Sequence, residues 1–296
     1  MLQVSELKKT FGDIKAVDGL NITVNKGNIY GLLGVNGSGK STTLRLILNL
    51  INPDSGSILI EGSKLTRGDR ILRKRLGALI ERPDFYQYLT AYKNLEILMR
   101  YSGLIPEKEK ILETLKVVGL EGFQHKKVGI YSQGMKQRLG IAQSIIHDPE
   151  LIILDEPFNG LDPQGIVDIR KLIIRLNRDF GKTIILSSHL LREVEMISDR
   201  MLIMNEGKTI AEGNVNELLH SFASRVRIRV SDTEGAFSVL QRRLHNKPII
   251  RGDHELICEI EEHEIPDVNR LLIDNSIDVL AIIPERNLED YFMSLV

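Results

Sequence analysis

The segment from residue 34 to residue 41 constrains the fold of this chain more than any other feature. It fits the pattern G-x-x-x-x-G-K-[ST] without gaps and reads Gly34-Val35-Asn36-Gly37-Ser38-Gly39-Lys40-Ser41. An apolar run precedes it, and a helix is expected to begin near Lys40. The glycines let backbone N–H groups turn inward, and the helix adds the positive end of its dipole. The pattern therefore predicts a phosphate-binding loop.

Within this loop, Lys40 is expected to reach the β- and γ-phosphates, Ser41 to bind Mg²⁺, and Thr42 to contact the nucleotide. The alternative, a glycine turn with a coincidental lysine, is disfavoured by this strand-and-helix context.

Two other predicted strands end in side chains that suit phosphate chemistry. The apolar run 151–154 leads directly into Asp155 and Glu156, and the run 183–187 leads to Ser188 and His189. Ligands of open α/β folds bind at the carboxyl edge of the sheet, where such residues gather. We expect Asp155 to hold Mg²⁺, Glu156 to polarise a water for attack on the γ-phosphate, and His189 to sense that phosphate. Solvated strand ends and a structural histidine are the alternatives, and the phosphate loop disfavours them.

The composition excludes several kinds of binding site and partner. The chain has 296 residues, and its 39 Lys and Arg against 40 Asp and Glu give a net charge of −1, which indicates no general affinity for nucleic acid. Cys258 is the single cysteine, so neither an internal disulfide nor a paired-cysteine zinc site can form. It stands in an apolar run that predicts core packing in a strand.

No stretch approaches the ~18 to 20 apolar residues of a membrane-spanning helix, and the N-terminus lacks a secretory pattern. We expect a cytoplasmic chain whose membrane part, if it needs one, is another polypeptide.

The hydrophobic pattern predicts two domains. Residues 1–220 alternate apolar strands and amphipathic helices, which is typical of a mostly parallel, buried sheet. The first helix is expected to run from Lys40 through Ile51, and a helical subdomain to occupy about residues 90–147. The boundary is expected at about 218–224. Residues 221–296 follow the order β-α-β-β-α-β of a ferredoxin-like α+β domain, with a last helix over Leu288–Leu295.

A third segment indicates one particular family among proteins with a phosphate-binding loop. Residues 131–138 read Tyr131-Ser132-Gln133-Gly134-Met135-Lys136-Gln137-Arg138 and resemble the signature of ATP-binding cassette (ABC) transporter ATPases, usually L-S-G-G-Q-x-Q-R. Gln133 and Met135 depart from that pattern. The resemblance extends over residues 2–217. It implies an α/β P-loop NTPase fold, with a RecA-like core plus antiparallel β and helical subdomains.

The resemblance also implies roles for residues outside the phosphate loop. Phe11 matches the aromatic residue that stacks on adenine, and Asp162 lies in the D-loop. Glu81 replaces the family's Q-loop glutamine, where a carboxylate can bind Mg²⁺ or a water. Ser132, Gln133 and Gly134 would lie at a positive helix end suited to a γ-phosphate.

The family implies ATP and Mg²⁺ as cofactors and two kinds of protein partner. Two cassettes face head to tail in this family, so a second copy, as a homodimer, is expected to share each ATP. Separate transmembrane permease subunits would hold the cassettes at the inner face of the cell membrane. Residues 80–90 and the ending Leu288-Glu289-Asp290-Tyr291-Phe292 resemble the bacitracin- and lantibiotic-resistance branch of bacterial exporters, which suggests export of peptide antibiotics or another hydrophobic cargo.

Several alternatives remain to be weighed. A GTPase would need an N-K-x-D motif, and the nearest string, beginning at Asn25, ends in asparagine. Repair and translation cassettes need a long coiled coil or two cassettes, which this sequence lacks. A regulatory subunit with low hydrolysis stays open, because Glu81 and the signature are unusual. The aromatic segment 83–89 is either subdomain core or a docking groove for a permease.

Overall fold

The computed structural model describes residues 1–66, 69–81, 83–221, 225–244, 249–252 and 254–285. By its internal contacts the chain divides into two units, Met1–Val215 and Asn216–Val296. The division falls a few residues before the expected 218–224, at the first residue of a short helix, α8 (Val215–Ser221). The last predicted helix, Leu288–Leu295, lies outside the described residues.

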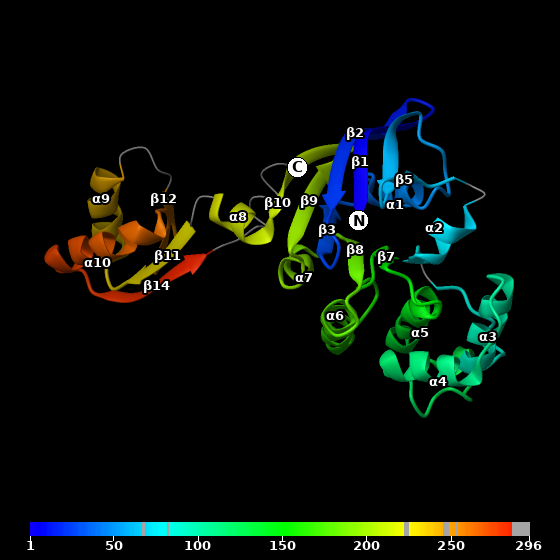
Figure 1. The fold of residues 1–296 in the computed structure, drawn as a ribbon. Coiled ribbons are helices and arrows are strands. Elements are labelled where there is room, and N and C mark those ends of the chain that lie inside the picture. Colours follow the sequence, from blue (N-terminus) through cyan, green and yellow to red (C-terminus); the bar gives the residue numbers. More distant parts are fainter. Residues whose placement is uncertain (67–68, 82, 222–224, 245–248, 253, 286–296) are drawn as a thin grey trace. The chain divides into compact units, whose positions relative to one another are not determined.

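A six-stranded sheet forms the centre of the first unit (Figure 1). Its order is β10-β9-β3-β8-β7-β6, and every pair is parallel except the edge pair β10–β9. The strands are β3 (Ile29–Gly34), β6 (Leu76–Leu79), β7 (Leu151–Leu154), β8 (Thr183–Ser188), β9 (Arg200–Asn205) and β10 (Lys208–Asn214). All of β7 is buried, as a parallel strand covered on both faces requires. The expected α/β fold is confirmed.

A second sheet, antiparallel, has the order β2-β1-β4-β5. Its strands are β1 (Leu2–Phe11), β2 (Ile14–Val24), β4 (Ser55–Ile60) and β5 (Ser63–Lys64). Alternate residues of β1 and β2, among them Leu2, Val4 and Leu20, enter a core shared with β3 and α1 (Lys40–Ile47). This is the antiparallel β subdomain that the family resemblance implied.

Helix α1 ends earlier than the expected Ile51. Asn49 takes a left-handed conformation with φ 53°, and its N–H donates to the carbonyl of Leu46. The N–H of Leu50 donates to the carbonyl of Arg45. This pair of bonds is the Schellman cap, which satisfies the last carbonyls of a helix and turns the chain away.

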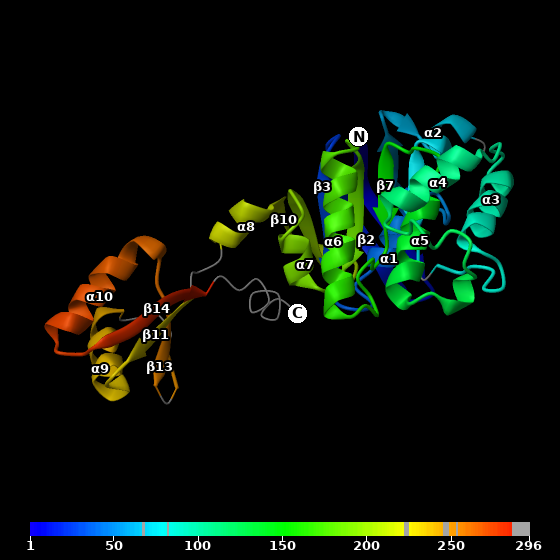
Figure 2. The same ribbon diagram turned by 90° about the horizontal axis from the view of Figure 1, so that it is seen from below.

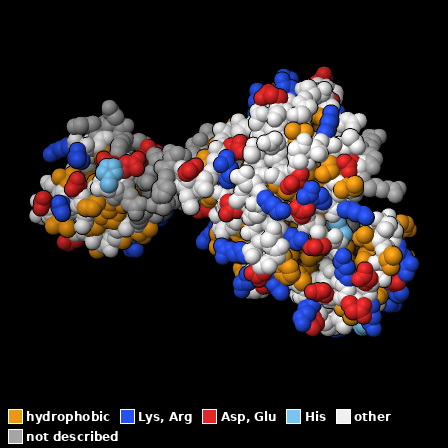
Figure 3. Space-filling view, viewed as in Figure 1, with side chains coloured by type: hydrophobic (Ala, Val, Ile, Leu, Met, Phe, Trp, Pro, Cys, Tyr) orange, Lys and Arg blue, Asp and Glu red, His pale blue; other side chains and the backbone are white. Residues whose placement is uncertain are grey.

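The structure describes further helices in this unit. They are α2 (Arg70–Lys74), α3 (Ala91–Tyr101), α4 (Lys108–Val117), α5 (Gln133–Ile145), α6 (Pro163–Arg178) and α7 (Leu191–Glu195), with a 3₁₀ turn at Val128–Ile130. Helices α3, α4 and α5 pack on one another as the helical subdomain. On the face in Figure 3, acidic and basic side chains are interspersed over this subdomain.

The second unit is a four-stranded antiparallel sheet with two helices on one side (Figure 2). The elements are β11 (Arg225–Val230), α9 (Thr233–Arg243), β12 (Ile249–Arg251), β13 (Glu255–Glu259), α10 (Ile265–Asp274) and β14 (Val279–Glu285), with a 3₁₀ turn at Glu262–Glu264. The sheet order β12-β13-β11-β14 is that of a ferredoxin-like fold. Cys258 is buried in its core, facing the helices, as its apolar neighbours predicted.

Candidate nucleotide site and signature site

The phosphate loop connects the end of β3 with the start of α1. Gly39 has φ 105°, and a Cβ there would lie 2.2 Å from the carbonyl oxygen of Ala16, so only glycine fits. The Lys40 ammonium is buried and donates to the carbonyls of Gly34, at 2.7 Å, and Val35, at 3.1 Å. The loop therefore holds its lysine close to its own backbone, at the positive end of a helix.

Asp155 and Glu156 follow β7 and lie next to this loop. The Asp155 carboxylate is buried, and its Oδ1 accepts hydrogen bonds from Ser41 Oγ at 3.1 Å and from Ser187 Oγ at 2.6 Å. Ser187 Oγ also accepts the backbone N–H of Glu156 at 2.9 Å. One hydroxyl of β8 therefore fixes both acidic residues, and sequence reasoning did not single it out.

The Glu156 side chain joins the lysine to the histidine. Glu156 Oε1 lies 3.4 Å from Lys40 Nζ, and Glu156 Oε2 lies 2.8 Å from His189 Nδ1. Three strands, β3, β7 and β8, thus deliver these side chains to a single edge of the sheet. A carboxylate held between a cation and an imidazole is well oriented to accept a proton from water.

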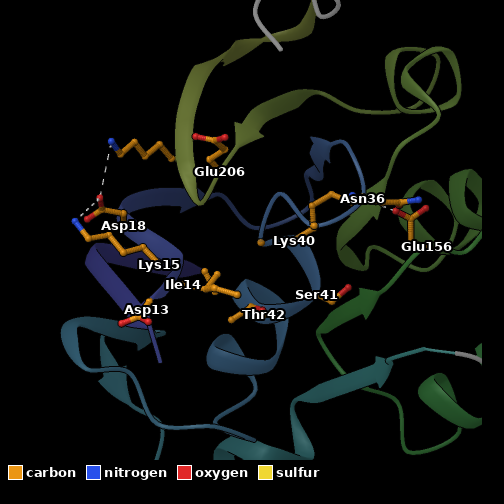
Figure 4. A pocket seen from close by; sticks show the side chains of 14 residues that line it. Asp13, Ile14, Lys15, Asp18, Asn36, Lys40, Ser41, Thr42, Glu156 and Glu206 are labelled. Atoms are coloured by element: carbon orange, nitrogen blue, oxygen red, sulfur yellow. Dashed lines mark ion pairs between the residues drawn. The ribbon is translucent and has the colours of Figure 1, made fainter. Parts of the chain in front are cut away.

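Lys40, Ser41 and Glu156 border a cavity of about 640 Å³, whereas Asp155 and His189 are not part of its lining (Figure 4). The predicted residues that line it are Asn36, Gly37, Gly39, Lys40, Ser41, Thr42 and Glu156. Of the other loop positions, Gly34, Val35 and Ser38 are not part of its lining. Ser38 Oγ is buried with no hydrogen-bond partner among the described residues.

Seven charged or apolar residues of the cavity wall were missed by sequence reasoning: Asp13, Ile14, Lys15, Ala16, Asp18, Glu206 and Lys208. They come from the β1–β2 turn and the start of β2, and from the β9–β10 turn and the start of β10. The Gly207 N–H donates to the Ser38 carbonyl at 3.0 Å, and the Asp18 N–H donates to the Gly207 carbonyl at 2.8 Å. These non-local bonds bring both turns to the phosphate loop, and no local sequence pattern announces them.

Phe11 does not line this cavity. Its ring is about half exposed and lies under the Lys9 ammonium, 5.4 Å from the ring centroid. The exposed apolar side chain at the cavity wall is that of Ile14. The stacking role expected for Phe11 therefore stays a prediction.

Glu81 does not line this cavity either. It is exposed, has a left-handed backbone with φ 63°, and forms an ion pair with Arg45 of α1. Its expected contact with Mg²⁺ or water likewise stays a prediction.

The signature segment forms a second cavity, of about 530 Å³, with the turn before α6. Ser132, Gln133, Gly134 and Asp162 all line it, together with Arg138. Ser132 Oγ caps α5 by accepting the Met135 N–H at 3.2 Å, and Asp162 caps α6. No residue borders both this cavity and the phosphate-loop cavity. The predicted nucleotide-binding residues therefore fall into two sets rather than one.

A phosphate loop at a parallel-sheet edge, with carboxylates from the neighbouring strand, defines the class of P-loop nucleoside triphosphatases. The family model described as ABC transporter matches residues 17–159. The bacitracin transport ATP-binding protein BcrA of Bacillus licheniformis is 40% identical over 301 residues, covering 100% of this chain and 97% of its own length. The lantibiotic transport ATP-binding protein SrtF of Streptococcus pyogenes is 43% identical over 212 residues, covering 72% and 90%.

Among solved structures, the dimeric post-hydrolysis state of the ATP-binding cassette MJ0796 with ADP and Pi is similar, with a TM-score of 0.65 and 27% identity. It covers 73% of this chain and 99% of that one. The chain belongs to the ABC transporter ATP-binding family and is an ABC-type ATPase. The resemblance to the bacitracin and lantibiotic branch is confirmed. In the described part of the chain, no helix is long and apolar enough to cross a membrane.

Proposed function

We propose that this chain hydrolyses Mg²⁺-ATP at the phosphate-loop cavity to drive a peptide-antibiotic exporter. The observation that carries the proposal is the contact chain Lys40–Glu156–His189, with separations of 3.4 and 2.8 Å. In the proposed reaction Lys40 binds the β- and γ-phosphates, Glu156 takes a proton from the attacking water, and His189 holds Glu156 in place beside the γ-phosphate.

Ser41 and Asp155 are the proposed Mg²⁺ ligands. Their oxygen atoms lie 3.1 Å apart at the loop, and hydroxyl and carboxylate oxygens suit this hard cation. Among the described residues there is no cluster of three or more His, Cys, Asp or Glu side chains that could hold a metal ion. When bound, Mg²⁺ neutralises charge that develops on the phosphate oxygens.

We further propose that two copies act together. The signature residues Ser132, Gln133 and Gly134 do not border the phosphate-loop cavity of their own chain. Two disjoint half-sites are what a head-to-tail pair needs, because each ATP would then lie between the loop of one copy and the signature of the other. The dimeric state of the similar MJ0796 cassette supports the pairing of two copies.

The proposed partners are separate transmembrane permease subunits, which would hold the cassettes at the cytoplasmic face of the membrane. The proposed cargo is a peptide antibiotic of the bacitracin or lantibiotic type, because BcrA and SrtF are named for such transport. Residues 1–220 would be the ATPase domain and residues 221–296 an accessory domain.

The first test changes the two groups that meet at the cavity. Glu156→Gln should lower kcat for ATP hydrolysis at least ~10²-fold while nucleotide affinity persists, because only proton transfer is lost. Lys40→Ala should lose affinity, measured by calorimetry. Asp148→Asn, an exposed carboxylate paired with Lys182, is the matched control and should keep both properties. Equal turnover of the wild type and Glu156→Gln would contradict the proposed base.

The cargo is tested in cells. The chain, expressed together with its proposed permease, should raise the bacitracin concentration needed to inhibit a sensitive strain. Glu156→Gln should abolish that protection at equal protein level. Full ATPase activity without protection by the wild type would reject peptide export and leave hydrolysis standing.

A further inference from the structure

The sheet of the second unit has one face on which neither α9 nor α10 lies. Alternate residues of β11, namely Val226, Ile228 and Val230, are buried against these two helices, which share one side of the sheet (Figure 2). Arg227 and Arg229, which alternate with them, therefore point to the opposite side. We call this opposite side the open face.

The two central strands carry opposite charges on the open face. The strand register pairs Arg229 of β11 with Glu255 of β13, and Arg227 with Ile257. At these positions β11 presents arginine, whereas β13 presents Glu255 and Glu259. Arg227 donates to both Glu255 oxygens, at 3.1 and 3.2 Å. Arg229 is exposed, and none of the residues that the structure describes forms an ion pair with it.

The two outer strands place an isoleucine at each edge of the open face. Ile257 pairs with Ile250 of β12, and Arg227 pairs with Ile283 of β14. Ile250 and Ile283 are 54% and 46% exposed. One row across the sheet therefore has an exposed apolar side chain at both ends and the charged strands between them.

We propose that the open face binds the open face of a second copy of this chain. A two-fold axis that runs along the strands, between β11 and β13, lays each β11 over the partner's β13 and each β14 over the partner's β12. Arg229 then lies opposite the partner's Glu255, and Ile283 lies opposite the partner's Ile250. The strands of the two sheets stay nearly aligned, as in face-to-face sheet packing.

The charges select this arrangement over the other two-fold pairing of the same faces. An axis that runs across the strands would lay β11 over the partner's β11, which sets arginine against arginine. It would also lay β13 over the partner's β13, which sets glutamate against glutamate. Like charges brought together at an interface suppress that pairing, whereas the axis along the strands brings opposite charges together.

The dimensions of the open face make the pair a weak one. Four strands span three gaps of about 4.8 Å, or about 14 Å, and the six residues of β11 extend about 20 Å. This outline of about 280 Å² is well below the about 800 Å² per partner of a stable interface. We therefore expect a reversible pair that needs no nucleotide and that is detected best by covalent trapping.

Disulfide cross-linking of the full chain without nucleotide tests this pairing. In a Cys258→Ala background, a chain with both Ile250→Cys and Ile283→Cys should form covalent dimers under mild oxidation. Within one chain the two positions lie about 14 Å apart, beyond the about 7 Å between Cα atoms that a disulfide can bridge, so the bond must join two copies. Mass spectrometry of the peptides should find position 250 joined to position 283.

The two single-cysteine chains are matched controls. Ile250→Cys alone and Ile283→Cys alone should each give several-fold less dimer than the double variant, because each cysteine would face an isoleucine of the partner. Mixing the two single variants should restore the cross-link. Equal dimer yields from the double variant and from either single variant would overturn the proposal.

Charge reversal gives a second readout. Arg229→Glu should lower the cross-linked fraction of the double variant several-fold, because it sets two carboxylates opposite each other. Arg242→Glu is the control, since Arg242 is exposed on α9, on the other side of the sheet, and it should leave the fraction unchanged. Equal losses in these two variants would contradict the pairing. Absence of any cross-link, as expected if another segment, a permease or a membrane covers the open face, would also overturn it, and would leave the ATP-dependent pairing of the first units untouched.

Discussion

Glu156 adopts a left-handed backbone conformation, with φ 47°, directly after the extended strand β7. Such a conformation is strained for a residue with a Cβ, and it turns the chain sharply at the strand end. The Ser187 hydroxyl accepts the N–H of that strained residue and donates to Asp155. A single buried side chain therefore sets the directions of both proposed catalytic carboxylates.

Replacing Ser187 with alanine tests this positioning role. It leaves a buried N–H and a buried carboxylate each with one partner fewer, which should destabilise the fold by about 1–3 kcal/mol. We expect kcat for ATP to fall more than KM rises, because Glu156 loses its orientation while Lys40 does not. Ser144→Ala is the control, since that buried hydroxyl bonds only Ile141 within α5. A loss of activity equal in the two variants at matched folded fraction would argue against positioning.

Between elements, Glu150 ties together three segments that are distant in sequence. Its carboxylate accepts from Arg75 Nε at 2.7 Å, just before β6, and from Lys26 Nζ at 3.2 Å, in the turn before β3. The hydrogen bond from Arg75, with further contributions from Lys26, lowers the pKa of Glu150 from 4.5 to about 2. The charged form is therefore favoured in the folded protein.

This depressed pKa predicts an acid-range effect on stability. The folded pKa lies below the unfolded one, so the stabilisation is complete above about pH 4.5 and disappears as the pH falls toward 2. Because the side chain is about a third exposed, solvent screening limits the contribution to about 1 kcal/mol or less. Urea unfolding of Glu150→Gln from pH 5 to 2.5 should show a shallower loss of stability than the wild type. Glu121→Gln, an exposed glutamate with a looser contact, should show the wild-type slope.

For the whole molecule, the informative feature is that each unit has a separate hydrophobic core. Leu272 and Ile228 belong to one buried cluster in the second unit, while Leu44 and Ile153 belong to another in the first. Neither cluster includes residues of the other unit. Two separate cores make independent unfolding the expected behaviour.

Leu272→Ala should therefore lower only one of two thermal transitions. Removing this buried side chain from α10 should cost the second unit about 2–5 kcal/mol. Mg²⁺-ATP should raise only the other transition, because a ligand stabilises the unit that binds it. Calorimetry with and without nucleotide separates the two. A single transition that responds to both changes would contradict independent cores.

The amino-acid sequence by itself determined the phosphate loop, the carboxylates after β7, the parallel sheet and the ferredoxin-like order. Each of these features is predicted by residues close together in the sequence, either by a motif of fixed spacing or by the period of the apolar residues, so its prediction needs no knowledge of distant contacts. Packing decided the rest. Tertiary contacts bring Ser187 to the carboxylates and bring Ile14 and Glu206 to the cavity wall. They also separate the signature from the phosphate loop, and each of these results depends on segments far apart in the chain. Gly77 illustrates the reason: a Cβ there would lie 2.0 Å from the Ser144 carbonyl, a constraint that exists only once α5 lies on β6.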